Sequence, residues 1–307
     1  MVLSVKFKRI IAAIFIAVCI AIGLGVGLGV GLTRNRGGSS DNTITNTSTP
    51  KNSSTTSIPK PRKLWVPKVN TTWDYKLDNP LNSVTAGVQV FDIDLFDNPQ
   101  SIIDEIHLQN KSVICYFSAG SYENWRSDSK KFNGSDLGKS LSGWEGERWV
   151  NLSSPNVRNI MASRIKLAHE KSCDAIDPDN INGYENDNGL GLTQSDSVEF
   201  IKFLSKEAHS YNISLSLKNS AEIIEKVIQL VDFSVQEQCV EYGECQPYEK
   251  FIAANKAVLH VEYPKGGKSN QQNVNSTTLD HYCRSRYESG FSTIIKNLNL
   301  DSWIQRC

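Results

Sequence analysis

Two short segments of the chain place carboxylates directly after apolar, strand-like runs. One is Ile176-Asp177-Pro178-Asp179-Asn180 and the other is Gln236-Glu237-Gln238-Cys239. Two carboxylates at strand ends, one acting as nucleophile and one as general acid/base, are sufficient equipment to hydrolyse a glycosidic bond. If both segments lie at the same end of a closed barrel, the sequence predicts a sugar-cleaving enzyme.

The elements that must hold these carboxylates alternate along the chain. Short β-rich runs are separated by stretches of helical period, and this alternation predicts a parallel sheet. The strand-like runs are Val88–Ile93, Ser112–Phe117, Arg148–Leu152, Ala175–Asp177, Ile213–Leu217, Phe233–Gln236, Ala257–Val261 and Ser292–Ile295. The helical stretches are Pro99–Gln109, Pro155–Lys171, Ser195–Tyr211, Ala221–Leu230 and Thr277–Ser289. Residues 63–307 match the length of one α/β (β/α)₈ TIM barrel, about 250 residues; a doubly wound open sheet is the alternative.

Polar side chains follow nearly every strand-like run. Because the carboxyl ends of barrel strands converge on one mouth, these side chains predict an acidic site there. The expected catalytic residues are Asp179 and Glu237, with Asp177, Asp92, Asp94, Tyr116, Tyr122, Glu123, Lys218 and Glu262 as expected substrate contacts. Structural roles remain open for some of them. Asp92 and Asp94 could pair with Lys218 or Lys296, and Asp177 could cap the turn after Pro178.

The N-terminal part of the chain has the pattern of a membrane anchor. Lys6, Lys8 and Arg9 precede an uncharged apolar run, Ile10–Leu32, that is long enough to cross a bilayer as a helix. We expect a cytoplasmic tail at residues 1–9, a transmembrane signal-anchor at 10–32 and a single-pass type II cell-membrane protein with an extracellular catalytic domain. A cleaved signal peptide is the alternative, but its apolar core is usually about 7–15 residues and ends in an Ala-x-Ala-like site. Shedding or secretion stays open.

Residues 33–62 are rich in Ser, Thr, Asn and Pro, which predicts a disordered stalk between the anchor and the domain at 63–307. Asn-x-Ser/Thr sequons predict a glycosylated ectodomain. They begin at Asn46, Asn52, Asn70, Asn110, Asn133, Asn151, Asn212 and Asn275.

The cysteines also agree with export. Apart from Cys19 in the apolar run, their number is even, which in an oxidising compartment predicts disulfides. From local spacing and strand adjacency we expect the pairs Cys115–Cys173, Cys239–Cys245 and Cys283–Cys307.

The composition of the chain argues against nucleic-acid, metal and cofactor partners. The chain has 33 basic and 33 acidic residues, so no overall field favours nucleic acid. The five histidines are scattered and no Cys/His cluster has metal-ligand spacing, so we expect neither a metal nor another cofactor. A monomeric ectodomain is expected. Several aromatic residues near loops could stack on sugar rings: Trp65, Trp73, Trp125, Trp144, Tyr122 and Tyr184.

An ordered set of motifs resembles glycoside hydrolase family 114, the endo-α-1,4-polygalactosaminidases. The set consists of Trp73-Asp74-Tyr75-Lys76-Leu77, Phe91-Asp92-Ile93-Asp94-Leu95-Phe96-Asp97, Ile114-Cys115-Tyr116-Phe117-Ser118-Ala119-Gly120-Ser121-Tyr122-Glu123 and the two carboxylate segments. The resemblance covers about Trp65 to Tyr263, and the anchored layout is similar to that of fungal members at the cell surface. It implies a TIM barrel related to α-galactosidases, with a catalytic Asp after the fourth strand and a catalytic Glu after the sixth.

By position, the resemblance implies that Asp179 is the nucleophile and Glu237 the general acid/base, with Asp177 as the other candidate nucleophile. One departure is Ile181-Asn182, where members often have Val-Asp, so one acidic substrate contact is missing. The expected reaction is endo-hydrolysis of an α-1,4-linked galactosamine-rich polysaccharide, with retention. A non-catalytic carbohydrate-binding barrel and an exo-acting, α-galactosidase-like hydrolase are the alternatives.

Overall fold

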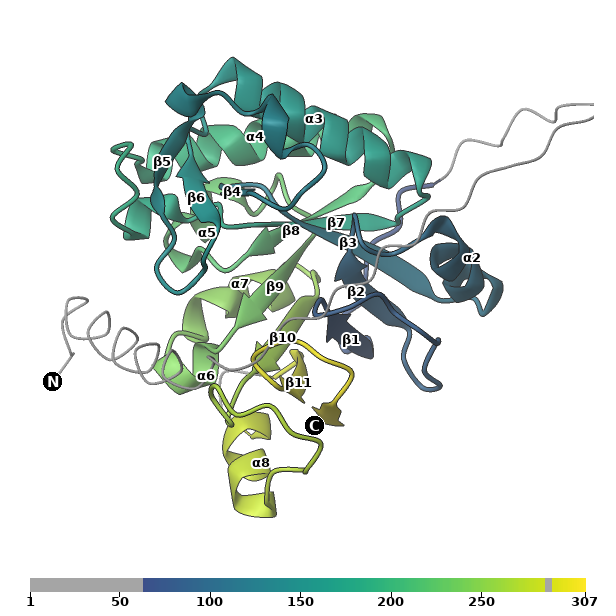
Figure 1. Cartoon of the computed structure of the whole chain (residues 1–307). Coiled ribbons are helices and arrows are strands. Elements are labelled where there is room, and N and C mark those ends of the chain that lie inside the picture. Colours follow the sequence, from purple (N-terminus) through teal and green to yellow (C-terminus); the bar gives the residue numbers. More distant parts are fainter. Residues whose placement is uncertain (1–62, 285–288) are drawn as a thin grey trace, which may run out of the picture. The chain divides into compact units, whose positions relative to one another are not determined.

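The strand-like runs form a curled nine-stranded sheet in the computed structural model, which describes residues 63–284 and 289–307 (Figure 1). Its order is β1 (Trp73–Lys76), β2 (Val90–Asp94), β3 (Ser112–Ser118), β7 (Ala175–Asp179), β8 (Ser214–Lys218), β9 (Phe233–Glu237), β10 (Val258–Glu262), β11 (Ser292–Lys296) and β12 (Ile304–Arg306). All neighbours are parallel except β12, which runs antiparallel to β11. This arrangement is a TIM-barrel-like α/β fold.

The seam between β1 and β11 is closed mainly by side chains. The indole N–H of Trp73 donates to the Ser292 carbonyl at 2.7 Å, and the Lys296 ammonium pairs with Asp74 at 2.9 Å. β12 pairs with the free edge of β11, so the main-chain groups of that edge bond to β12 and not to β1. The barrel is therefore nearly closed by hydrogen bonds and completed by these contacts.

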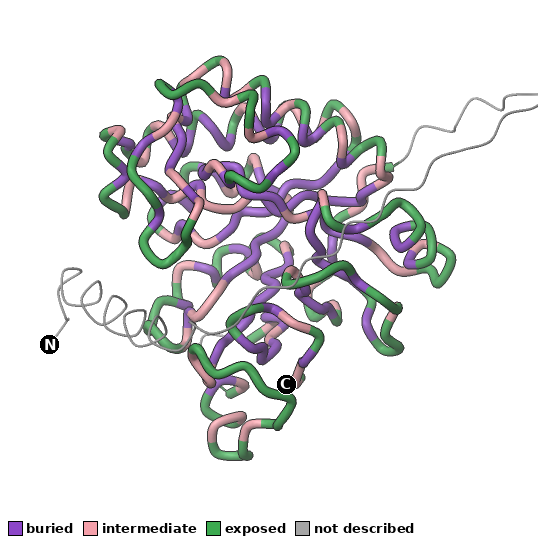
Figure 2. The backbone as a smooth tube through the Cα atoms, viewed as in Figure 1, coloured by how far each residue is buried: buried purple, intermediate pink, exposed green. Residues whose placement is uncertain are grey.

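Helices cover the outside of the barrel in all five predicted stretches. The longer ones are α2 (Gln100–Leu108), α3 (Pro155–Glu170), α4 (Gln194–Ser210) and α8 (Ser276–Cys283), and the short ones are α5 (Ile224–Val227), α6 (Cys239–Tyr242) and α7 (Glu249–Ala253). The stretch 221–230 forms only a short 3-10 turn and α5, and α6 and α7 were not predicted. α3 begins with a Ser154 cap and Pro155, and α4 with a reciprocal Thr193–Asp196 capping box. Figure 2 shows the buried strands enclosed by partly exposed helices.

A three-stranded antiparallel sheet is inserted between β3 and α3. It consists of β4 (Ser121–Glu123), β5 (Leu137–Ser140) and β6 (Glu147–Val150), in the order β4-β6-β5. The interpretation of Arg148–Leu152 as a barrel strand was wrong, because β6 belongs to this small sheet. The first barrel strand is instead Trp73–Lys76. The two errors compensate, so β7 and β9 are still the fourth and sixth barrel strands.

All three expected disulfides are confirmed: Cys115–Cys173 joins β3 to the segment before β7, Cys239–Cys245 closes the α6 turn, and Cys283–Cys307 ties α8 to the C-terminal segment. No helix within residues 63–284 and 289–307 has the length and apolarity needed to cross a membrane. The tail expected at 1–9, the signal-anchor at 10–32 and the stalk at 33–62 lie outside the described residues.

Candidate active site

Lys218, the last residue of β8, lies at the centre of a group of carboxylates from neighbouring strands. Its Nζ atom is 3.2 Å from Asp177 Oδ2, 3.8 Å from Asp179 Oδ2 and 3.6 Å from Glu237 Oε2, and it donates to the Tyr75 hydroxyl. Asp179 and Glu237 therefore both contact the ammonium group of Lys218, which holds the two carboxylates close together. The convergence expected from the strand ends is present.

Asp179 ends β7 and is held from several directions. The Tyr116 hydroxyl donates to Oδ2 at 3.0 Å, and the Asn180 backbone N–H donates to Oδ1 at 2.7 Å. The side chain is nevertheless 18% exposed. Burial raises the pKa of Asp179, while the nearby Lys218 ammonium opposes that rise. The result is a fixed carboxylate with a face open to a ligand.

Glu237 ends β9 and is equally well held. The Tyr263 hydroxyl donates to Oε1 at 2.5 Å and the Asn219 amide donates to Oε2 at 3.2 Å. The Glu237 backbone N–H in turn donates a hydrogen bond to the Asn219 side-chain oxygen at 3.0 Å. Gln238 then takes a left-handed conformation with φ of 58°, which turns the chain into α6. With 23% exposure, the Glu237 carboxylate also reaches the surface of the site.

Two further acids lie beneath this pair inside the barrel. Asp177 is fully buried, accepts from Ser216 and contacts Lys218. Its burial raises the pKa to about 6, against the opposing charge of Lys218. Asp92 is fully buried too, neither of its oxygens has a hydrogen-bond partner among the described residues, and burial with the Asp177 charge raises its pKa well above the usual range. Both side chains, predicted to contact substrate, are closed off from solvent: Asp177 is bound to Ser216 and Lys218, whereas the Asp92 oxygens have no hydrogen-bond partner among the described residues.

Asp94 and Glu123, two of the predicted substrate contacts, are both paired with Arg126 in the structure. Arg126 binds Asp94 with nitrogen–oxygen distances of 3.1 and 2.5 Å and contacts Glu123 at 2.9 Å. Arg164 adds a two-point contact to Asp128, with both distances 2.9 Å. These groups are buried and paired, so they join β2, β4 and α3 rather than face a ligand. Lys296, considered as a partner for Asp94, binds Asp74 instead.

Glu262 and Tyr122 also have structural contacts. Glu262 is fully buried at the end of β10, where it accepts from the Val240 N–H at 2.7 Å and contacts His260 at 2.9 Å. Glu262, predicted to contact substrate, therefore supports the α6 turn. Tyr122 is half-buried and packs edge-to-face on Phe132. Of the expected contacts, Tyr116 and Lys218 are the ones that touch Asp179 or Glu237.

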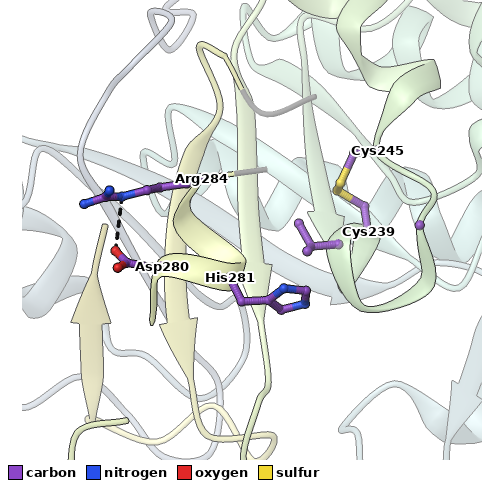
Figure 3. A pocket seen from close by; sticks show the side chains of 7 residues that line it. Cys239, Cys245, Asp280, His281 and Arg284 are labelled. Carbon is purple, nitrogen blue, oxygen red and sulfur yellow. Dashed lines mark ion pairs between the residues drawn. A yellow bond between two sulfur atoms is a disulfide. The ribbon is translucent and has the colours of Figure 1, made fainter. Parts of the chain in front are cut away.

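A pocket of about 440 Å³ lies beside the Cys239–Cys245 disulfide (Figure 3). Its lining residues are Cys239, Val240, Gly243, Cys245, Asp280, His281 and Arg284, and neither Asp179 nor Glu237 is among them. Cys239, Cys245 and buried His260 lie close enough together to hold an ion. Because both cysteines are in a disulfide, neither offers the thiolate that a metal needs. This cluster does not fit a metal.

Sequence reasoning missed Glu147, the first residue of β6. The Ser121 hydroxyl donates to Glu147 Oε2 at 2.7 Å, and burial raises the Glu147 pKa to about 7. The strand-like run was taken to begin at Arg148, one residue later. A carboxylate at the start of a strand gives no sign in sequence that it will be buried and linked to the Asp179–Asn180 turn through Ser121, since that link depends on the inserted sheet.

Comparison with known proteins places this geometry in a family. The family model of glycoside hydrolase family GH114 matches residues 54–307. The solved structure of Aspergillus fumigatus Ega3 in complex with galactosamine has a TM-score of 0.78 and 47% sequence identity, over 80% of this chain and 98% of that chain. The glycoside hydrolase domain of PelA from Pseudomonas aeruginosa, at 8% identity over 76% of this chain and 98% of that chain, has a TM-score of 0.57 and shows the fold alone. No curated protein matches the chain.

Proposed function

Because this chain belongs to glycoside hydrolase family GH114, we propose that it cleaves a galactosamine-containing polysaccharide at internal α-1,4 linkages, with Asp179 and Glu237 as the catalytic pair. The chain is a glycoside hydrolase. The substrate is inferred from Ega3, whose structure contains galactosamine.

One observation carries the assignment of the pair. Asp179 and Glu237 lie 3.8 and 3.6 Å from the same Lys218 nitrogen, and both remain partly exposed while the other nearby acids are buried. This spacing supports a carboxylate on either side of one sugar ring. Retaining glycosidases need their carboxyl groups about 5–5.5 Å apart.

In the proposed reaction, Asp179 attacks the anomeric carbon while Glu237 gives a proton to the departing glycosidic oxygen. Glu237 then takes a proton from water, which attacks the same carbon and releases Asp179, so that the configuration is retained. Tyr116 and the Asn180 N–H hold Asp179 during attack. Asp177, two residues before Asp179 on β7, is fully buried and therefore too deep for this role.

Lys218 remains a cation throughout. Burial alone would lower its pKa, but the charges of Asp177, Asp179 and Glu237 outweigh burial and raise the pKa well above the usual range. Its fixed positive charge favours the ionised form of Asp179, which the attack requires. The amine of a galactosamine unit is cationic, and an acidic site raises the local concentration of such a polymer.

The test is product analysis with the full chain. We expect a partially deacetylated α-1,4-galactosamine polymer to yield short oligosaccharides of mixed length from the start of the reaction, with the anomeric configuration retained in the first product seen by NMR. Release of single sugars only would support the exo-acting alternative. Binding without any cleavage would support the non-catalytic alternative.

We also propose that residues 10–32 anchor the enzyme in the membrane with residues 63–307 outside the cell. The uncharged run and the disulfides of the described residues support this orientation. Asn70, Asn110, Asn133, Asn212 and Asn275 are exposed, as glycan acceptors must be. Protection of residues 63–307 from added protease in sealed, right-side-out cells would contradict the orientation, as would a mass insensitive to glycosidase.

A further inference from the structure

The inserted sheet reaches the active site at the junction of β3 and β4. The backbone N–H groups of Ala119 and Gly120 donate to the Asp179 carbonyl at 2.9 and 3.0 Å. A Cβ on Gly120 would lie 1.7 Å from the Asn180 carbonyl oxygen, so the two backbones are in direct contact there. Asn180 itself has a left-handed φ of 61°. The position of the Asp179–Asn180 turn therefore depends on this junction.

A chain of side-chain hydrogen bonds continues from the turn into the inserted sheet. Asn180 Nδ2 donates to Ser118 Oγ at 3.0 Å and to Ser121 Oγ at 3.2 Å. The two serine oxygens are 2.5 Å apart, and Ser121 donates to Glu147 Oε2 at 2.7 Å. Since a hydroxyl has one proton, Ser118 donates to Ser121 while Ser121 donates to Glu147. Glu147 is thus the acceptor that fixes the direction of the whole chain.

Glu147 is only 7% exposed and has charged neighbours on three elements. Glu123 lies directly opposite on β4, Arg126 follows β4, and Asp179 approaches from β7. Burial raises the Glu147 pKa to about 7; the Ser121 hydrogen bond and Arg126 oppose the rise, and Glu123 and Asp179 add to it. Burying a carboxyl group that ionises near neutral pH destabilises the fold. Such groups are common at functional sites, so the position of Glu147 near Asp179 suggests a role in the reaction.

We propose that Glu147 is a positioning residue for the reaction: through Ser121 and Asn180 it holds the Asp179 carboxylate in place, and when ionised it adds a negative charge close to the reacting sugar. The inference rests on the proposed function, since Asp179 is the nucleophile there. The transition state of glycoside hydrolysis carries positive charge on the sugar ring. A second negative charge nearby stabilises it.

Three single variants, one double variant and a control separate these two effects. Glu147→Gln keeps an acceptor oxygen and removes the charge, whereas Glu147→Leu removes both. Ser121→Ala breaks the chain and leaves the carboxylate. Glu145→Gln is the matched control, because Glu145 is exposed two residues earlier. Each is measured in the full chain for kcat and KM between pH 5 and 8, with the melting temperature recorded to confirm folding.

We expect Glu147→Leu and Ser121→Ala each to lower kcat by about tenfold to a hundredfold with little change in KM, because the nucleophile is misplaced. The double variant that combines Glu147→Leu with Ser121→Ala should be no slower than the slower of the two single variants, because both substitutions break the same series of hydrogen bonds. The ratio of wild-type to Glu147→Gln activity should be near one at pH 5 and rise to about threefold to tenfold at pH 8. Titration of the substrate amine cancels in this ratio.

Independent, multiplying losses in Glu147→Leu and Ser121→Ala, or a ratio that does not change with pH, would overturn the inference while leaving the proposed function intact. If Glu147→Leu does not fold, the Glu147→Gln ratio still decides. A wild-type chain that never cleaves the polymer would overturn the proposed function, and the inference with it.

Discussion

Two clusters of acids lie near the carboxyl ends of the barrel strands, one buried and one partly exposed. In the arginine cluster, Arg126 and Arg164 face Asp94, Glu123 and Asp128. In the lysine cluster, one ammonium of Lys218 faces Asp177, Asp179 and Glu237. In sequence the two clusters look alike, since both place acids after strand-like runs.

The difference is in the balance of charge and in exposure. The guanidinium groups make short contacts of 2.5 to 3.1 Å with Asp94 and Asp128, and the Phe96 ring lies against both, 5.0 and 5.1 Å away. The Lys218 contacts are longer and shared among three carboxylates, two of which are partly exposed. Paired buried charges stabilise the fold, whereas surplus exposed carboxylates remain available for chemistry.

The largest expected effect tests the lysine cluster. Asp179→Asn and Glu237→Gln should each lower kcat by about 10³-fold or more, because each removes a group that takes part in bond breaking. The melting temperature should change by no more than a few degrees. Glu105→Gln, on exposed α2, is the control. Full activity in either variant would break the distinction between the clusters.

The arginine cluster should respond in the opposite way. Asp128→Ala leaves buried Arg164 without its two-point partner, which should cost about 3–5 kcal/mol of unfolding free energy. Chemical denaturation measures this loss. Activity per folded molecule should stay within about twofold of wild type. Glu170→Ala, which breaks an exposed pair with Lys166, should change the free energy of unfolding far less, because solvent screens the pair. A stable but inactive Asp128→Ala would place this cluster in the reaction.

A smaller effect concerns stability and pH. Folding raises the Glu147 pKa from 4.5 to about 7, so the folded state binds this proton more tightly and loses stability as pH rises between these values. Glu147→Gln lacks this loss. Its melting temperature relative to wild type should therefore rise by a few degrees from pH 4.5 to pH 8. Parallel curves for the two proteins would show that Glu147 ionises freely in the fold.

The smallest expected effect tests whether substrate binding extends to two exposed tryptophans near the arginine cluster. Trp125, beside Arg126, and Trp144, in the β5–β6 loop, are 54% and 59% exposed. If they stack on the polymer, Trp125→Ala and Trp144→Ala should raise KM for long substrates by about twofold to fivefold and leave kcat and melting temperature unchanged. Leu108→Ala, 83% exposed at the end of α2, is the control. An unchanged KM would confine substrate binding to the lysine cluster.

Sequence patterns predicted the parts of the site that depend on barrel geometry. Asp179 and Glu237 converge because parallel strands end at one mouth, and the disulfides followed from strand adjacency. The roles of Asp94 and Glu123 could not be predicted, because their partners Arg126 and Arg164 come from a loop and a helix whose positions depend on the inserted sheet. The short strand Trp73–Lys76 was missed as an element, since its Asp and Lys interrupt the apolar pattern; both turn out to be buried or paired across the seam.

The seam between β1 and β11 is where the barrel should open locally most often. Few main-chain hydrogen bonds cross it, so amide protons of β1 should exchange with solvent sooner than those of the central strands. In the order of the sheet, β7 and β8 are the strands farthest from the seam, and β3 and β9 come next. Transient opening at the seam would thus begin away from β7 and β9, the strands that carry Asp179 and Glu237, and would reach Lys218 through the Tyr75 hydroxyl of β1.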